Sequence, residues 1–329
     1  MGIAILSGIL SSLRDMQSAA HSLRPPPIST TSTTSGTSTP QEEVPSRLPT
    51  RFIACVRRPE SAKKVKAALA PYLPSSSVSG SPVTIAQNDN VSAVRKADVV
   101  LLACKPYMMS EILGEAGMAE ALRGKLLISI LAGVPAAQIE SQLASSASES
   151  QAYRDNPALV VRAMPNTASQ IRESMTVIGA RDPPLPAEAS GLVTWIFRRI
   201  GDVVHLPPST MDACTALCGS GPAFFALMLE AAIDGAVAMG LPRAEAQRMA
   251  AQTMRGTAGL VLNGDHPALL RDKVSTPGGC TIGGLLVLEE GRVRGTVARA
   301  VREATVVASQ LGQGVQGVNG TRFGGSQFQ

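Results

Sequence analysis

Aromatic, histidine and cysteine residues are scarce in this chain of 329 residues, and their scarcity excludes several classes of protein. Aromatic residues make up 3% of the sequence, so the core must be built from Ala, Val, Leu, Ile and Met, which favours close helix contacts. The three His residues form no motif, and the five Cys residues include no C-x-x-C spacing. We therefore expect no metal site, and we expect free thiols in a reducing compartment such as the cytoplasm.

The chain also lacks any long run of charge of one sign. Its 30 Lys and Arg residues are scattered, with short pairs such as Arg57-Arg58 and Arg198-Arg199. A nucleic-acid-binding surface needs basic residues gathered on one face, so we expect no nucleic-acid partner. The apolar stretch 222–240 carries Glu230 and Asp234 and is rich in Ala and Gly, so we expect no membrane span either.

A turn that feeds a helix, residues 272–282, is the most informative stretch that the sequence does contain. Pro277 fixes one φ angle, Gly278 and Gly279 carry no Cβ, and an apolar run follows. Such a turn directs backbone N–H groups to one point at the positive end of a helix, which suits a small carboxylate. Thr281 would add a hydroxyl beside that point. For these residues alone, a glycine-rich helix cap without a ligand is the alternative interpretation.

A second stretch, Leu-Cys-Gly-Ser-Gly-Pro-Ala-Phe at 217–224, opens a long apolar helix in the same region. Together, the two stretches resemble the pyrroline-5-carboxylate reductases, NAD(P)H enzymes that make proline from its cyclic imine. The signature Ser/Thr-Pro-Gly-Gly-x-Thr-Ile of that family matches within residues 275–282. The resemblance extends over nearly the whole chain, except for an insertion near its start and the tail beyond about Gly312.

This resemblance implies a Rossmann-like α/β domain at 1–208 and an all-α substrate and dimerisation domain at 209–312. We expect disorder in a Pro/Ser/Thr-rich insertion at about 22–50 and in the tail at 313–329. Family members begin with an apolar strand and a Gly-x-Gly-x-Met/Leu turn, and Met1 aligns with the last residue of that turn. We therefore expect the first strand and both glycines to be absent, and residues 1–10 to form a helix.

Several apolar runs predict the strands of the first domain, at 51–56, 83–86, 98–106, 126–131, 175–179 and 202–206. Open α/β sheets bind ligands at the carboxyl ends of their parallel strands. Arg57 and Arg58 follow the first run, where a basic residue accommodates the 2′-phosphate of NADP and an acidic one favours NAD. We therefore expect NADPH, with NADH as the second choice. Solvent-facing charges at a helix start are the alternative for both arginines.

The resemblance also implies individual site residues. Those expected to contact the cofactor are Met1, Arg57, Arg58, Asn90, Cys104, Lys105, Pro106, Ala132, Gly133 and Asn166. For Asn166, stabilisation of a turn is an equally plausible role. Those expected to hold the substrate carboxylate are Val274, Ser275, Thr276, Gly278, Gly279, Cys280 and Thr281. Thr281 stands at the catalytic position of the family and would hydrogen-bond the ring nitrogen.

The expected reaction is the reduction of 1-pyrroline-5-carboxylate to L-proline, the last step of proline biosynthesis. A neutral Thr is too weak an acid to be the sole proton source, so water or an already protonated imine is implied. Because stretch 222–240 is apolar on every side except at Glu230 and Asp234, we expect it to be buried on every side. We therefore expect a homodimer or a larger homo-oligomer assembled through helices at 222–240, 244–262, 266–274, 281–290 and 293–311.

Two other functions stay open. The first is a catalytically impaired oligomerisation subunit that lacks the phosphate-binding loop. The second is a related NADP-dependent 3-hydroxy acid dehydrogenase, which should carry a catalytic Lys where residues 211–221 have none. For the location we expect the cytoplasm, with the mitochondrion as the alternative because Arg14, Arg24 and many Ser residues lie near the start.

Overall fold

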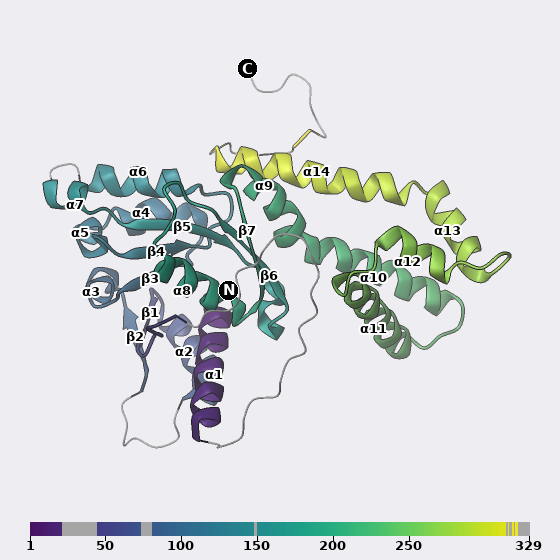
Figure 1. The fold of residues 1–329 in the computed structure, drawn as a ribbon, viewed down its shortest axis with the longest axis horizontal. Helices are drawn as coiled ribbons and strands as arrows, with labels where there is room; N and C mark the ends of the chain where they lie inside the picture. Colours follow the sequence, from purple (N-terminus) through teal and green to yellow (C-terminus); the bar gives the residue numbers. More distant parts are fainter. Residues whose placement is uncertain are drawn as a thin grey trace. The chain divides into compact units, whose positions relative to one another are not determined.

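The computed structural model describes residues 1–21, 45–73, 81–147, 150–313, 315, 318 and 320–321. Most of the predicted insertion and of the predicted tail lies outside these residues, so their disorder stays a prediction. The chain divides into unit 1, Met1–Gly219 with Ala308–Val318, and unit 2, Ser220–Val307 with Asn319–Gln329 (Figure 1). The division falls after the predicted boundary at 208, because Met211 and Cys214 pack with Met164 and Val177 of the sheet.

Unit 1 is built on two sheets. The larger sheet has the order β3 (Val99–Leu102), β4 (Leu126–Ser129), β5 (Leu159–Met164), β6 (Ser174–Gly179) and β7 (Gly201–Leu206). Strands β3, β4 and β5 are parallel, β6 runs antiparallel to β5, and β7 runs parallel to β6. The smaller sheet pairs β1 (Phe52–Val56) with β2 (Val83–Gln87) in parallel. The predicted strands are all present, but they do not form one continuous sheet.

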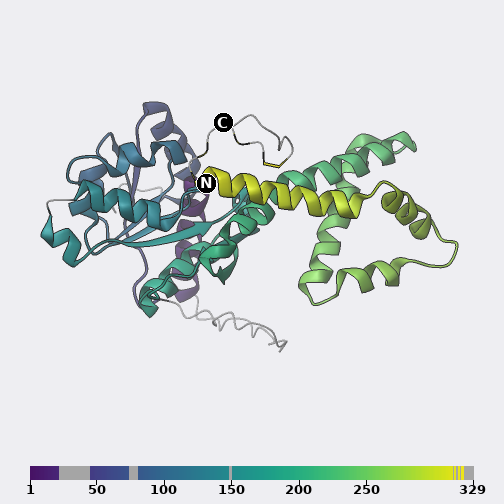
Figure 2. The ribbon, with the colours of Figure 1, turned by 90° about the horizontal axis from the view of Figure 1, so that it is seen from above.

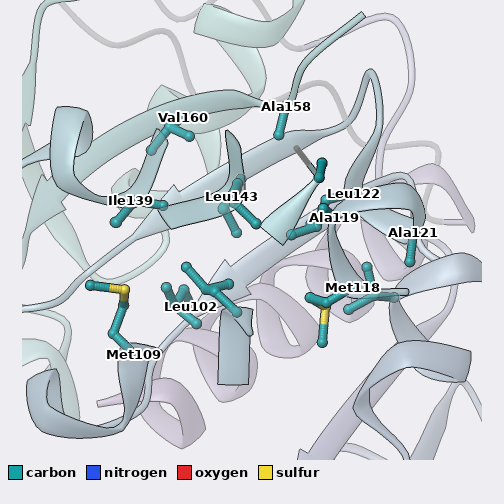
Figure 3. Close-up of a cluster of buried hydrophobic side chains, with 14 of the residues drawn as sticks. Leu102, Met109, Met118, Ala119, Ala121, Leu122, Ile139, Leu143, Ala158 and Val160 are labelled. Atoms are coloured by element: carbon teal, nitrogen blue, oxygen red, sulfur yellow. The ribbon is translucent and has the colours of Figure 1, made fainter. Parts of the chain in front are cut away.

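Helices cover both faces of the larger sheet, as a sheet of continuous apolar strands requires. On one face, Met109 and Leu143 belong to one cluster (Figure 3). The same cluster contains Leu127 of β4. On the other face, Ile5 and Trp195 pack with Ile128 of β4. Neighbouring residues of a strand point to opposite faces, which places Leu127 and Ile128 in different clusters. The first face carries α4 (Met109–Leu113), α5 (Met118–Leu122) and α6 (Ala136–Ser146), and the second carries α1 (Gly2–His21) and α8 (Ala187–Arg198).

Helix α1 extends beyond the predicted residues 1–10 to His21. Its Ile5 and Ile9 belong to the cluster on the larger sheet. Its Leu10 packs with Val65 and Leu69 of α2 (Pro59–Leu69), beside side chains of β1 and β2. Helix α1 therefore packs on both sheets and holds them together. Unit 1 also contains the α-helices α3 (Asn90–Arg95), α7 (Gln151–Asp155) and α9 (Met211–Cys214).

Unit 2 is helical. It contains α10 (Gly221–Ala238), α11 (Arg243–Leu262), α12 (Pro267–Val274) and α13 (Cys280–Glu290), together with the first turns of α14 (Val293–Gly312), drawn from green to yellow in Figure 2. In α10 the single chain buries Gly221 alone, so the burial predicted for 222–240 is not provided within one chain. The segment Pro208–Ala238 is long and apolar enough to cross a membrane by length and composition alone, and 11% of its most apolar window is buried within the single chain.

Candidate active site

The predicted cofactor residues of unit 1 lie at the carboxyl ends of its parallel strands. Because β3, β4 and β5 are parallel neighbours, the loops that follow them meet at one edge of the sheet. These loops contain Cys104-Lys105-Pro106, Ala132-Gly133 and Asn166. The start of α1 lies at the same edge, because the Ser169 hydroxyl after β5 donates to Met1 Sδ at 3.3 Å. The structure thus brings together residues far apart in the sequence.

The two arginines after β1 are both exposed to solvent. Arg57 Nη1 lies 3.8 Å from Glu111 Oε1 of α4, the helix that follows the loop after β3. Arg58 is the residue before α2 and makes no side-chain capping bond. An exposed ion pair at that distance contributes about 0–1 kcal/mol, so a phosphate could replace Glu111 as the partner of Arg57 at little cost.

Two of the asparagines that were predicted to contact the cofactor make side-chain hydrogen bonds within the protein. Asn90 Nδ2 donates to Glu115 Oε1 at 2.6 Å. Asn166 Oδ1 accepts from the Ala168 amide at 3.0 Å and thereby caps the short helix η3 (Thr167–Ile171). The role of turn stabilisation, which the sequence left open for Asn166, is therefore present in the structure.

The loop after β3 combines an exposed cation with a shielded thiol. Lys105 is exposed, and its extended backbone is the conformation that a following proline favours. Burial raises the pKa of the Cys104 thiol. A thiol with a raised pKa stays protonated at neutral pH and is a poor nucleophile. Cys104 therefore suits a packing or contact role at this edge and not covalent chemistry.

Arg162 is a residue of this region to which the sequence interpretation gave no role. It lies on β5 opposite Ser129 of β4 and is 8% exposed. Within the described part of the chain, its buried Nε and Nη2 have no hydrogen-bond partner. Burial lowers the pKa of the guanidinium, and the negative charge of Asp212 acts in the opposite direction. The sequence feature that could have pointed to Arg162 is its charge inside an otherwise apolar strand.

The predicted substrate residues lie together in unit 2, in and beside the turn between α12 and α13. Gly278 has a φ of 67°, and the Gly279 amide donates to Thr276 O at 3.0 Å. The Gly283 amide donates to Gly279 O at 3.5 Å. The amides of residues 280–282 precede this bond, and helix geometry leaves such amides without an intrahelical acceptor. These amides lie at the start of α13, with the partly exposed Thr281 among them, and their binding of an anion stays a prediction.

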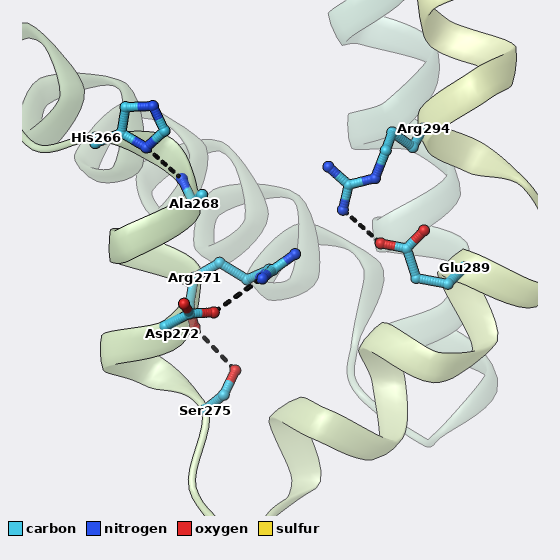
Figure 4. A network of polar contacts seen from close by, with 7 residues as sticks. All are labelled: His266, Ala268, Arg271, Asp272, Ser275, Glu289 and Arg294. Atoms are coloured by element: carbon cyan, nitrogen blue, oxygen red, sulfur yellow. Dashed lines mark hydrogen bonds and ion pairs between the residues drawn. The ribbon is translucent and has the colours of Figure 1, made fainter.

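Several polar side chains near this turn find hydrogen-bond partners within unit 2 (Figure 4). The Ser275 hydroxyl donates to Arg271 O at 2.8 Å, and Arg271 Nη2 donates to Asp272 Oδ1 at 2.9 Å. Arg294 hydrogen-bonds Glu289 at 2.5 Å and lowers the pKa of that carboxyl. Since these cations are paired, an anion at the turn would be attracted chiefly by the backbone amides. Ser275 would then contribute through its backbone, because its hydroxyl is engaged.

Comparison with known proteins identifies the family. A model of pyrroline-5-carboxylate reductase dimerisation matches residues 208–311, and a model of coenzyme F420-dependent NADP oxidoreductases matches residues 38–133. Over 323 residues, the chain is 68% identical to a pyrroline-5-carboxylate reductase of Lophium arboricola, covering 98% of this chain and 94% of that protein. The chain belongs to the pyrroline-5-carboxylate reductase family.

Further relatives of this reductase support the same assignment. A pyrroline-5-carboxylate reductase of Neurospora crassa is 59% identical over 334 residues, covering 98% of this chain and 93% of that protein. The crystal structure of the Plasmodium falciparum pyrroline carboxylate reductase with NADP bound matches with a TM-score of 0.62 and 28% identity, covering 73% and 85% of the two chains. The predicted Rossmann-like and helical domains, and the predicted NAD(P)H-dependent enzyme class, are confirmed.

Proposed function

We propose that this enzyme reduces 1-pyrroline-5-carboxylate to L-proline with NADPH, as the last step of proline biosynthesis. The observation that carries this proposal is the turn of unit 2 that ends in Thr281. It presents the amides of residues 280–282 at the start of α13, where the helix dipole favours a carboxylate. The family assignment supports the same substrate.

In this proposal the backbone holds the substrate and Thr281 orients it. The carboxylate lies among Val274, Ser275, Thr276, Gly278, Gly279 and Cys280, whose paired neighbouring charges leave the amides as its main partners. The Thr281 hydroxyl hydrogen-bonds the ring nitrogen and thereby fixes which face of the imine carbon is presented for reduction. A bound nicotinamide supplies the hydride. The nitrogen proton comes from water or is already on the imine, since a neutral hydroxyl is a poor acid.

The residues of unit 1 fit a dinucleotide phosphate. The loops after β3, β4 and β5 lie at one edge, where Lys105 and Ala132 are exposed, and Arg57 and Arg58 are exposed after β1 of the smaller sheet. The proposed contacts are Met1, Arg57, Arg58, Asn90, Cys104, Lys105, Pro106, Ala132, Gly133 and Asn166. The two arginines favour NADPH over NADH, because the 2′-phosphate gives them an anionic partner.

The proposed enzyme is a homo-oligomer of the cytoplasm. Exposed apolar side chains are frequent in unit 2, with Leu227 67%, Leu262 82% and Leu286 58% exposed in the single chain. Such surface is unfavourable in water, so a second copy of this chain is the proposed cover. All five cysteines are free, which supports a reducing compartment.

The test measures NADPH oxidation with the cyclic imine for the wild type and three variants. Thr281→Val should lower kcat about tenfold by removing one hydrogen bond, with little change in the substrate KM. Thr281→Ser should retain activity. The control is Thr257→Val on α11, whose hydroxyl donates to Thr253 O of its own helix. Turnover of a 3-hydroxy acid with NADP, and none of the imine, would contradict the proposed substrate.

A further inference from the structure

The end of α14 packs directly on the turn that follows β4, backbone against backbone. Gly133 has a φ of 72°, and a Cβ placed on it would lie 3.4 Å from Leu311 Cβ and 3.5 Å from Gly312 N. A Cβ placed on Gly312 would lie 2.8 Å from Gly133 O. All three residues belong to unit 1. A Cβ almost never lies within 3.0 Å of another heavy atom, so a side chain at position 312 must displace the Gly133 carbonyl.

The flanks of this turn are held by the core. Leu131 is 1% exposed and Val134 is 7% exposed in the cluster on the α6 face of the sheet. The Ile130 amide donates to Leu102 O at 3.1 Å. Between these anchored positions, Ala132 stays exposed while Gly133 is buried. The conformation of Ala132 and Gly133 therefore depends on the end of α14, which lies against Gly133.

The end of α14 is itself well defined. Ala308 is 6% exposed, and the Gln313 amide donates to Ser309 O at 3.0 Å and to Gln310 O at 3.2 Å. The Val315 amide also donates to Gln310 O, at 3.0 Å. These bonds close the last turn of the helix, so it presents a fixed backbone surface to Gly133.

We propose that Gly312 is a positioning residue, and that the last turn of α14 sets the Ala132-Gly133 turn for the nicotinamide half of the cofactor. This inference rests on the proposed cofactor contacts of Ala132 and Gly133. In this proposal Gly312 acts without contacting the cofactor itself. It acts by letting the helix end approach the Gly133 carbonyl, which fixes the direction of the neighbouring peptide groups. Displacement of catalytic geometry by about 1 Å can lower rates a hundredfold.

The experiment compares Gly312→Ala and Gly312→Val with the control Gly191→Ala. Gly191 lies inside α8 of the same unit, and a Cβ there would meet nothing within 4 Å. NADPH affinity is measured by fluorescence, beside the affinity for 2′-phospho-ADP-ribose, which lacks the nicotinamide. Gly312→Ala should weaken NADPH about tenfold and Gly312→Val more. Affinity for the fragment should not change in either variant, and Gly191→Ala should match the wild type.

Hydrogen exchange without cofactor provides a second readout. The amides of residues 130–134 should exchange faster in Gly312→Ala than in the wild type or in Gly191→Ala. Unchanged NADPH affinity in both position-312 variants would overturn the inference, and so would equal weakening of NADPH and the fragment. A wild type that binds NADPH but does not reduce the imine would contradict the proposed substrate, while the binding comparison would still decide the role of Gly312.

Discussion

Asn166, a predicted cofactor contact, also stabilises the fold through a capping hydrogen bond. Its Oδ1 accepts from the Ala168 amide at 3.0 Å, so Asn166→Ala should lower the free energy of unfolding by about 1 kcal/mol. Asn166→Asp keeps the acceptor and should stay close to the wild type. Urea unfolding of the two variants measures the difference, and equal stabilities would show that this capping bond contributes little.

Arg57 and Arg58 are expected to determine whether the enzyme prefers NADPH or NADH. Replacing both with Gln should weaken NADPH about tenfold to a hundredfold and NADH far less, because a charge-assisted contact to phosphate is worth roughly 1.5–3 kcal/mol. The matched control replaces Lys63 and Lys64, exposed on the neighbouring helix α2, and removes the same charge. Affinities for both cofactors measure the effect. Equal losses for NADPH and NADH would contradict the assignment.

For single residues, the sequence predicts a role where that role follows from a local pattern. The turn before α13 is predictable because Pro277, Gly278 and Gly279 define it locally. The role proposed for Gly312 is not, because it depends on Gly133, which is distant in the sequence. The engagement of the Ser275 hydroxyl by Arg271 O likewise requires coordinates.

Among the elements, α1 links the two sheets of unit 1, so its buried face should matter most for stability. Ile5 is 1% exposed and Ile3 is 37% exposed on the same helix. Ile5→Ala should lower the free energy of unfolding by about 2–5 kcal/mol, since it leaves a cavity. Ile3→Ala, the control, should cost less than about 1 kcal/mol. Chemical unfolding of both variants makes the comparison, and similar losses would mean that α1 is not anchored by this face.

Most strands could be placed from sequence to within a few residues, because each parallel strand is a short apolar run. The full length of α1 could not. Residues 11–21 are largely polar, and their anchor is tertiary: Arg14 Nη1 donates to Pro71 O at 2.9 Å and lies over the Tyr72 ring. The division of the strands into two sheets depends on strand pairing, which is a long-range property.

For the whole molecule, the exposed apolar side chains of unit 2 predict self-association. Leu286→Arg places a charge on this surface and should shift the protein to smaller species at micromolar concentration. Ile171→Arg is the control, because Ile171 is also exposed, at 73%, but belongs to unit 1. Light scattering after size exclusion measures the mass. A wild-type monomer at that concentration would refute the prediction.

Helix α14 has a consequence for the assembled enzyme, because its first turns belong to unit 2 and its last turn packs on Gly133. The helix thus belongs in part to the surface proposed for assembly and in part to the turn proposed to contact the cofactor. If assembly restrains this helix, subunit association and NADPH affinity are thermodynamically linked, and each must strengthen the other by the same factor. Dilution should then weaken NADPH binding, and saturating NADPH should lower the subunit dissociation constant. Sedimentation with and without NADPH measures this linkage, and identical dissociation constants would mean that the two ends of α14 act independently.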